Sequence, residues 1–343
     1  MRNDTAVIYL ARYCEGAEPI RRFIASYRRF AAEAPHDLII VWKGSPNGDG
    51  DENLQNAIGS QVQHQSISIP DDGYDIGAYR IAAEQLPHDT VFFANTFSEI
   101  LSSGWLRKLQ SVLAVAGVGI VGATGSYQSL RDSLKEISKV IWLCGQHIPY
   151  DEEFAKRWGS EIIKHKPAWI KQTLVERCLA RVGPYIRRTG SLDERYEAYW
   201  RAVTSPGGPL DLYARFPGFP NPHIRTNAFM LARKLFLDLC PRKMDSKNEA
   251  HEFESGLSSL THLLLQRGLC AKIVGNDGMG YEIEDWPMSE TFRLGQQENL
   301  LVADNQTRMF DAMTPRERDA NAEMAWGARE LSNRLMAQAD IKN

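Results

Sequence analysis

Two glutamates in the segment 251–256 have the side-chain type that can move a proton. Glu254 is our first candidate for a general base, because a carboxylate can take the proton of an attacking hydroxyl group. Glu252 is the second, and its i, i+2 spacing from Glu254 places the two on different faces of a helix. The structural alternative is a Glu in a first helical turn, stabilised by the helix dipole. His251 precedes them without the second His of a zinc helix, so no metal site is expected here.

A second candidate is the acidic, glycine-containing turn at residues 70–80. A strand-to-helix turn presents backbone N–H groups at a helix N-terminus, which suits a phosphate, and Gly77 lies in that turn. Asp75 is expected either to accept from a nucleoside hydroxyl or amide, or simply to cap the helix. Arg80 is expected to reach a diphosphate.

Two polar segments are expected to complete a donor-binding site. Asn95 and Ser98 follow an apolar run, and the structural alternative for Asn95 is a buried amide that ties two loops together. Arg225 and Asn227 precede another apolar run and could hydrogen-bond sugar hydroxyls or phosphate, or be a surface Arg and a strand-edge Asn. We interpret the glycine-containing segment 122–126 as a simple turn in preference to a segment that binds a sugar.

A late cluster combines aromatic and acidic side chains. Asp277, Tyr281 and Trp286 are predicted to bind an acceptor, because sugars are held by ring stacking and hydrogen bonds. The same residue types are also ordinary in loops.

Short apolar runs alternate with amphipathic segments in the first third of the chain. Strands are expected at residues 6–10, 37–42, 66–69, 90–94 and 118–121, and helices at 19–34, 77–86 and 105–116. This alternation predicts an α/β fold with a mostly parallel central sheet and helices on both faces. Ligands of such sheets bind at the carboxyl ends of the strands, where the candidate residues above are placed.

The later chain divides by pattern into further parts. Residues 1–126 are the first α/β half, 127–222 a helical insertion with a Pro/Gly-rich loop, 223–313 the acceptor-side half, and 314–343 a C-terminal helix. The second half includes an amphipathic helix at 254–268 and a strand at 270–274. The insertion has a basic face that we read as solvated, with contact to an anionic membrane as the alternative; it comprises Lys164, Lys166, Lys171, Arg177, Arg181, Arg187 and Arg188.

Composition narrows the class of function. The 343 residues carry a net charge of −3, which argues against a nucleic-acid partner. The five cysteines are scattered, which predicts reduced thiols and a cytoplasmic location. No apolar run reaches the roughly 18 residues of a membrane span, so any membrane contact is expected to be peripheral.

With these positions assigned, the chain resembles the GT-A glycosyltransferase superfamily. Its branch for rhamnan and polysaccharide synthesis carries a turn like Gly73-Tyr74-Asp75-Ile76-Gly77, and the resemblance covers residues 5–126 and 223–285. It implies transfer from a nucleotide-sugar donor to a glycan or lipid-linked acceptor in surface polysaccharide biosynthesis, with inversion and Glu254 as base. Lys43 stands near the position where the family often has an Asp that reads the nucleobase.

The family's metal-binding Asp-x-Asp position is Asn95-Thr96-Phe97 in this chain. Mg²⁺ and Mn²⁺ prefer carboxylates, so the sequence leaves open whether one of them or no metal is used. A catalytically inactive GT-A-like module that binds glycan or protein is the alternative function. A nucleotidyltransferase is a third, and that chemistry needs carboxylate-held Mg²⁺.

Overall fold

The computed structural model describes residues 3–45, 49–145, 191–208 and 210–327. The chain divides into two compact units: Met1–Ser129 together with Pro217–Asn343, and Leu130–Phe216. The second unit lies within the segment 127–222 that we expected to be an insertion. The expected basic face between Lys164 and Arg188 lies outside the described residues. None of the helices in the described ranges is long and apolar enough to cross a bilayer.

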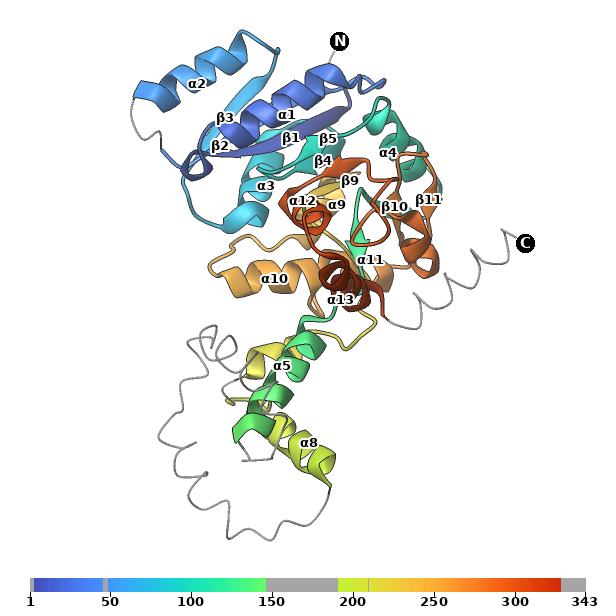
Figure 1. The fold of residues 1–343 in the computed structure, drawn as a ribbon. Helices are drawn as coiled ribbons and strands as arrows, with labels where there is room; N and C mark the ends of the chain where they lie inside the picture. Colours follow the sequence, from blue (N-terminus) through green and yellow to red (C-terminus); the bar gives the residue numbers. More distant parts are fainter. Residues whose placement is uncertain (1–2, 46–48, 146–190, 209, 328–343) are drawn as a thin grey trace, which may run out of the picture. The chain divides into compact units, whose positions relative to one another are not determined.

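An eight-stranded sheet forms the centre of the first unit (Figure 1). Its strand order is β11-β10-β6-β9-β4-β1-β2-β3. Neighbours pair in parallel except where β9 and β11 are involved, so six of the eight strands run in one direction. The predicted mostly parallel sheet is therefore confirmed. The strands are β1 (Thr5–Arg12), β2 (Asp37–Lys43), β3 (Gln65–Ile69), β4 (Thr90–Ala94), β6 (Val118–Gly122), β9 (Ala228–Ala232), β10 (Cys270–Val274) and β11 (Gly280–Tyr281).

Alternate residues of the central strands face two separate hydrophobic layers, as the two-residue period of a strand requires. Ile8 and Phe93 belong to one layer, and Tyr9 and Phe92 belong to the other. All four side chains are fully buried. The sheet is thus covered on both faces, as predicted.

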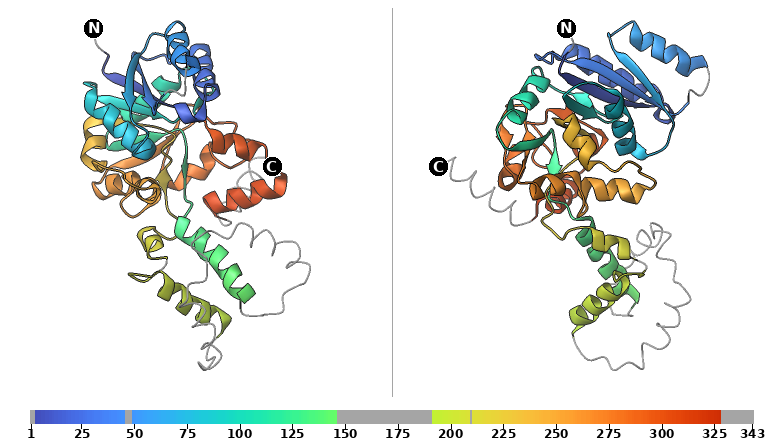
Figure 2. Two further views of the ribbon diagram at one scale, coloured as in Figure 1. Left: turned by 90° about the vertical axis from the view of Figure 1, so that its left-hand side faces the viewer. Right: turned by 180° about the vertical axis from the view of Figure 1, so that it is seen from behind.

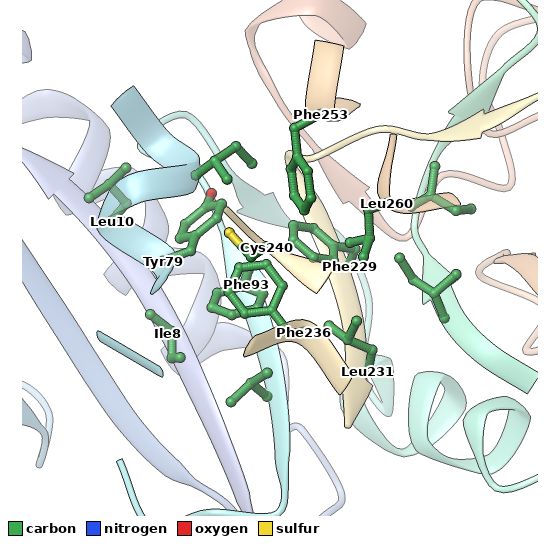
Figure 3. Close-up of a cluster of buried hydrophobic side chains, with 14 of the residues drawn as sticks. Ile8, Leu10, Tyr79, Phe93, Phe229, Leu231, Phe236, Cys240, Phe253 and Leu260 are labelled. Atoms are coloured by element: carbon green, nitrogen blue, oxygen red, sulfur yellow. The ribbon is translucent and has the colours of Figure 1, made fainter. Parts of the chain in front are cut away.

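Helices α3 (Tyr74–Gln85), α9 (Arg233–Leu239), α10 (Lys247–Ser255), α11 (Leu260–Gln266) and α13 (Pro315–Trp326) contribute to the first layer. Figure 3 shows its aromatic centre, where Phe93 and Phe229 of neighbouring strands lie against Tyr79, Phe236 and Phe253 from three helices. The ring centroids of Phe93 and Tyr79 are 4.6 Å apart. The second layer is covered by α1 (Glu18–Arg29), α2 (Asp49–Gly59) and α4 (Trp105–Leu113).

Two short ladders bring distant segments to the strand ends. β5 (Glu99–Ile100) pairs with β12 (Val302–Ala303), which precedes α12 (Asn305–Asp311). β7 (Gly125–Ser126) pairs with β8 (His223–Ile224), which places Arg225 beside the end of β6. Two 3₁₀ helices, Tyr13–Glu15 and Ile283–Ser289, complete the described elements of this unit.

Three predicted helices differ in their ends. The helix predicted at 254–268 is two helices, because α10 ends at Ser255 and a separate α11 begins after the cap residue Ser259. The helix predicted at 77–86 begins already at Tyr74. The C-terminal helix predicted at 314–343 begins at Pro315, after the N-cap residue Thr314, and ends at Trp326, whose buried indole donates to the carbonyl oxygen of Phe292.

The second unit is described in part. α5 (Leu130–Gly145) and α8 (Leu192–Val203) pack together (Figure 2), and a 3₁₀ turn follows at Asp211–Arg215. Its small core consists of Leu134, Tyr196, Trp200 and Leu210. Ser191 begins α8 with a capping box, in which its side chain and that of Glu194 satisfy each other's backbone N–H groups.

Candidate functional site

Several of the candidate residues gather at one edge of the large sheet. The carboxyl ends of β1, β2, β4 and β6 lie at this edge, and the antiparallel β9 begins there. The segment 225–227, directly before β9, therefore faces the loops that follow the parallel strands. Asn95 donates its backbone N–H to the carbonyl oxygen of Asn227 at 2.8 Å, which joins the two segments directly.

Glu254 lies in the last turn of α10, half-buried against the start of β9. One carboxylate oxygen accepts from both the backbone N–H and the hydroxyl of Thr226, each at 3.0 Å. The expected alternative, a Glu in a first helical turn, is wrong, because the helix begins at Lys247. A negative charge is disfavoured at a helix C-terminus, so these two hydrogen bonds are what hold Glu254 in place.

Asp75 lies in the first turn of α3 without capping it. The N-cap position is Gly73, in a left-handed conformation with φ 69°, and no side chain caps this helix, so the capping interpretation is wrong. Burial raises the pKa of Asp75 above its ordinary value, and Glu254 raises it further, while Lys43 and Arg12 oppose the shift. Within the described ranges, no hydrogen bond ends on this carboxylate. Its acceptor oxygens thus remain available to a ligand.

Two cations that we did not assign as ligands surround the acidic turn. Lys43 at the end of β2 is 2% exposed, donates to the carbonyl oxygen of Tyr74 at 2.8 Å, and lies 3.7 Å from Asp71. Arg12 at the end of β1 lies 3.8 Å from the same carboxylate. Burial lowers the pKa of Lys43, and the charge of Asp75 acts in the opposite direction. The buried ammonium thus fixes the turn that presents Asp75.

Two histidines lie close enough to Glu254 for its charge to affect their pKa values. His223 is buried, and its Nδ1 lies 2.9 Å from the carbonyl oxygen of Asn221. Nδ1 therefore carries the proton, and Nε2 is left as an acceptor. Burial lowers the pKa of His223 and of His251 although Glu254 raises both. Both imidazoles are neutral at pH 7, so they leave the charge of Glu254 uncompensated.

Asn95, Ser98 and Asn227 form a polar cluster in which Ser98 and Asn227 are buried and Asn95 is half-buried. Asn95 Oδ1 accepts from the backbone N–H of Phe97 and from the Ser98 hydroxyl. Ser98 is 1% exposed and lies 3.0 Å from the carbonyl oxygen of Asn227. Asn227 Oδ1 accepts from Thr124 at 2.8 Å, while its Nδ2 is buried without a partner among the described residues. The Asn95 amide therefore bonds within its own turn and does not tie two loops together; the Ser98 hydroxyl makes the contact between segments, and Asn227 keeps one unused donor.

Arg225 is held by three contacts at the edge of the site. It donates to Asp304 at 2.8 Å and to Thr124 at 3.3 Å, and its guanidinium lies 4.2 Å above the Phe292 ring. Asp304 is 1% exposed and also caps α12. Burial alone would raise the pKa of Asp304. Arg225 and the hydrogen bonds from Thr307 outweigh burial and hold this pKa below its ordinary value.

Several predicted site residues have other roles. Arg80 is buried and donates to the carbonyl oxygens of Leu237 and Cys240, so its guanidinium packs α3 against α9 and the diphosphate interpretation is wrong. Trp286 is 0% exposed and therefore cannot stack on a sugar. Gly77 lies in the first turn of α3, where an added Cβ would come 3.7 Å from Met244.

The remaining candidates are not brought to Glu254 by any described contact. Tyr281 donates to Asp277 at 2.6 Å beyond β10, and burial together with this bond raises the pKa of Tyr281 to about 12. Glu252 accepts from Ser258 at 3.0 Å. The expected acceptor subsite at Asp277 and Tyr281 stays a prediction.

A small pocket opens between the ends of β1 and β2. Its aromatic wall is Tyr13 stacked on Trp42, with ring centroids 5.5 Å apart. Arg12 and Thr96 supply polar groups at its rim. The other lining residues are Tyr9, Ala11, Gly16, Ile20 and Leu54. No sequence motif indicated this pocket, because its walls come from four separate segments.

No metal cluster is formed by the described part of the chain: no three His, Cys, Asp or Glu side chains are arranged to hold an ion.

Comparisons with known proteins return distant structural matches. No family model and no curated protein matches the chain. The mannosyltransferase PcManGT from Pyrobaculum calidifontis, in complex with GDP-Man and Mn²⁺, is 15% identical over 36% of this chain and 35% of its own, with a TM-score of 0.30. S. aureus TarS is 13% identical over 36% of this chain and 21% of its own, with a TM-score of 0.29. A TarS 1–349 complex with UDP is 13% identical over 36% and 35%, with a TM-score of 0.29. This chain therefore covers about a third or less of the length of each matched protein.

Proposed function

We propose that this protein is a glycosyltransferase that moves a sugar from a nucleotide-sugar donor to a hydroxyl of a glycan or lipid-linked acceptor. The observation that carries the proposal is the placement of Glu254 and Asp75 together at the carboxyl edge of the sheet. Burial raises the pKa of Asp75, and the charge of Glu254 adds a smaller contribution in the same direction. Among the described residues, one of these carboxylates is hydrogen-bonded and the other is not. Two carboxylates in such different environments are suited to different roles, one in proton transfer and one in substrate binding.

Glu254 is the proposed general base. Its carboxylate takes the proton of the acceptor hydroxyl as that oxygen attacks the anomeric carbon, and the bond to the diphosphate breaks on the opposite side. Inversion at the anomeric carbon follows from such a single displacement. Thr226 orients Glu254 through its two hydrogen bonds, which leaves the second carboxylate oxygen for the acceptor.

The donor is proposed to lie across the ends of β1, β2 and β4. Arg12 and Thr96, at the ends of β1 and β4, supply polar groups on this edge. Asp75 is proposed to accept hydrogen bonds from hydroxyl groups of the donor, since its oxygens have no partner among the described residues. Arg225 and Asn227 are proposed to contact the sugar or phosphate from the start of β9.

Turnover of nucleotide-sugars tests the proposal. Release of nucleoside diphosphate is measured for the common UDP-, GDP-, CDP- and TDP-sugars with a mixed glycan acceptor. Glu254→Gln should lower the rate by about 10²–10⁴-fold, because it removes a general base. Donor binding and the melting temperature should be retained. Glu252→Gln on the same helix is the matched control, and loss of rate in this variant alone would move the base to Glu252.

A catalytically inactive binding module is the second candidate, and one observation favours it. The turn after β4 has no carboxylate at Asn95, Thr96 or Phe97. A binder would retain a glycan or a partner protein while releasing no nucleotide from any sugar donor. Wild-type protein that binds glycan but is inactive with every donor would therefore replace the first proposal with this one.

A further inference from the structure

The turn after β4 has few oxygen atoms to offer a metal ion. The Thr96 hydroxyl, which has no partner among the described residues, is neutral. Asn95 Oδ1 already accepts two hydrogen bonds, from Phe97 N and from the Ser98 hydroxyl. The carbonyl oxygen of Thr96 accepts from Tyr9 at 2.7 Å. Mg²⁺ and Mn²⁺ bind through oxygen lone pairs, with a strong preference for carboxylates. The donor set of this turn therefore does not fit the divalent ion that the family resemblance implies.

The nearest carboxylate and the last carbonyl of this turn are both bound to Arg308. Its guanidinium donates to the carbonyl oxygen of Phe97 at 3.0 Å and to Glu99 at 3.2 Å. A metal ion bound there would have to displace this cation. Arg308 is 29% exposed, and its hydrogen bonds to Phe97 and Glu99 use two of the five N–H donors of a guanidinium. Donors thus remain for a ligand at the same place.

Further groups around Arg308 are also suited to an anion. Burial and the neighbouring Arg22 lower the pKa of Arg308, so a second guanidinium lies near it. Asn227 Nδ2, which is buried in the same polar cluster, is a donor without an acceptor among the described residues. Unused donors and clustered arginines favour phosphate oxygens over a cation.

We propose that Arg308 takes the electrostatic role of a metal ion and neutralises the diphosphate of the donor. This inference rests on the proposed transferase function and makes it independent of divalent metal. As the bond from the anomeric carbon to the diphosphate oxygen breaks, its electron pair stays on the leaving diphosphate. The guanidinium N–H groups stabilise that developing negative charge.

Calorimetric titration with UDP, GDP and inorganic pyrophosphate, in EDTA and in Mn²⁺, tests the inference on the full chain. A diphosphate should bind in EDTA with a dissociation constant within about threefold of that in Mn²⁺. Arg308→Gln should weaken binding at least about tenfold, since it removes a charge-assisted hydrogen bond. Arg308→Lys should retain part of the affinity that Arg308→Gln loses. Arg107→Gln is the matched control. Arg107 also forms an ion pair with a glutamate, Glu33, but it lies on α4 and is not part of the proposed diphosphate site.

Glu99→Gln separates an electrostatic role from a structural one. If Arg308 acts through its charge, removing its carboxylate partner should tighten diphosphate binding at least about twofold. If Arg308 only fastens the loop, Glu99→Gln should weaken binding as Arg308→Gln does, and the inference is overturned. Binding that needs Mn²⁺ also overturns it but leaves the transferase proposal standing. The absence of any diphosphate binding overturns both.

Discussion

Removing the buried charge of Asp304 should destabilise the first unit strongly. The Asp304 carboxylate is 1% exposed and the Arg225 side chain 13% exposed, with 2.8 Å between them. The substitution Asp304→Asn keeps the shape of the side chain and a hydrogen-bond acceptor for the α12 cap. It leaves the guanidinium of Arg225 without its counter-charge.

The magnitude follows from that geometry. Breaking a buried ion pair from one side costs about 3–5 kcal/mol, and the slight exposure of Arg225 places this pair near about 3 kcal/mol. Asp304→Ala also removes the acceptor for the Thr307 N–H at 2.9 Å, and the loss of a helix cap adds about 1 kcal/mol. The alanine variant should therefore be the less stable of the two by about 1 kcal/mol.

Urea denaturation followed by tryptophan fluorescence measures both differences. Asp238→Asn on the surface, whose partner is Lys234, is the control and should leave the midpoint unchanged. The pKa of Asp304 is lowered in the folded state, so its contribution is present above the unfolded pKa of about 3.9 and is lost as pH falls through the folded value. Asp304→Asn should remove that part of the acid dependence. An unchanged urea midpoint for Asp304→Asn would refute this reasoning.

Three further changes test other parts of the account. Asp75→Asn should raise the melting temperature at pH 7, because the raised pKa of Asp75 means that ionising it in the folded state costs free energy above about pH 4. This gain in melting temperature should vanish as the pH falls to about 4, and the control Asp72→Asn, at an exposed position, should show no gain. Gly125→Ala should cost about 1–3 kcal/mol in thermal unfolding, because the new Cβ would lie 2.9 Å from Ile273 and 3.0 Å from Trp286, and full stability would contradict this packing. Thr226→Val should lower transfer about tenfold by freeing Glu254 while diphosphate binding is unchanged, and an equal loss of binding would argue against a purely orienting role.

The strands and the sheet type were predictable because they depend on local patterns. Short β-branched runs separated by amphipathic segments require a covered parallel sheet, and these runs became β1, β2, β3, β4 and β6. The antiparallel direction of β9 was not predictable, because nothing in the residues 228–232 specifies which neighbours they will join. That direction nevertheless decides the site, since it brings Thr226 and Asn227 to the edge where β4 ends.

The site was predictable in residue type but not in contacts. Glu254 and Asp75 were selected from local spacing, yet their juxtaposition depends on the packing of α10 and α3 at the same sheet edge. Arg80 and Trp286 were misassigned because chemistry-bearing side chains are also used in cores, and burial cannot be read from a single loop. The role of Arg308 depends on the pairing of β5 with β12, which joins segments about two hundred residues apart in sequence.

The most direct test of the central claim is a thermal-shift measurement with UDP, GDP, CDP and TDP and their common sugars. A ligand that binds only the folded state raises the melting temperature by mass action. We expect a shift with at least one nucleotide in EDTA. We expect a smaller shift in Asp75→Asn, each measured against the same variant without ligand, because Asp75 is proposed to bind hydroxyl groups of the donor. No shift with any nucleotide at concentrations well above millimolar would contradict a nucleotide-sugar site at this edge of the sheet.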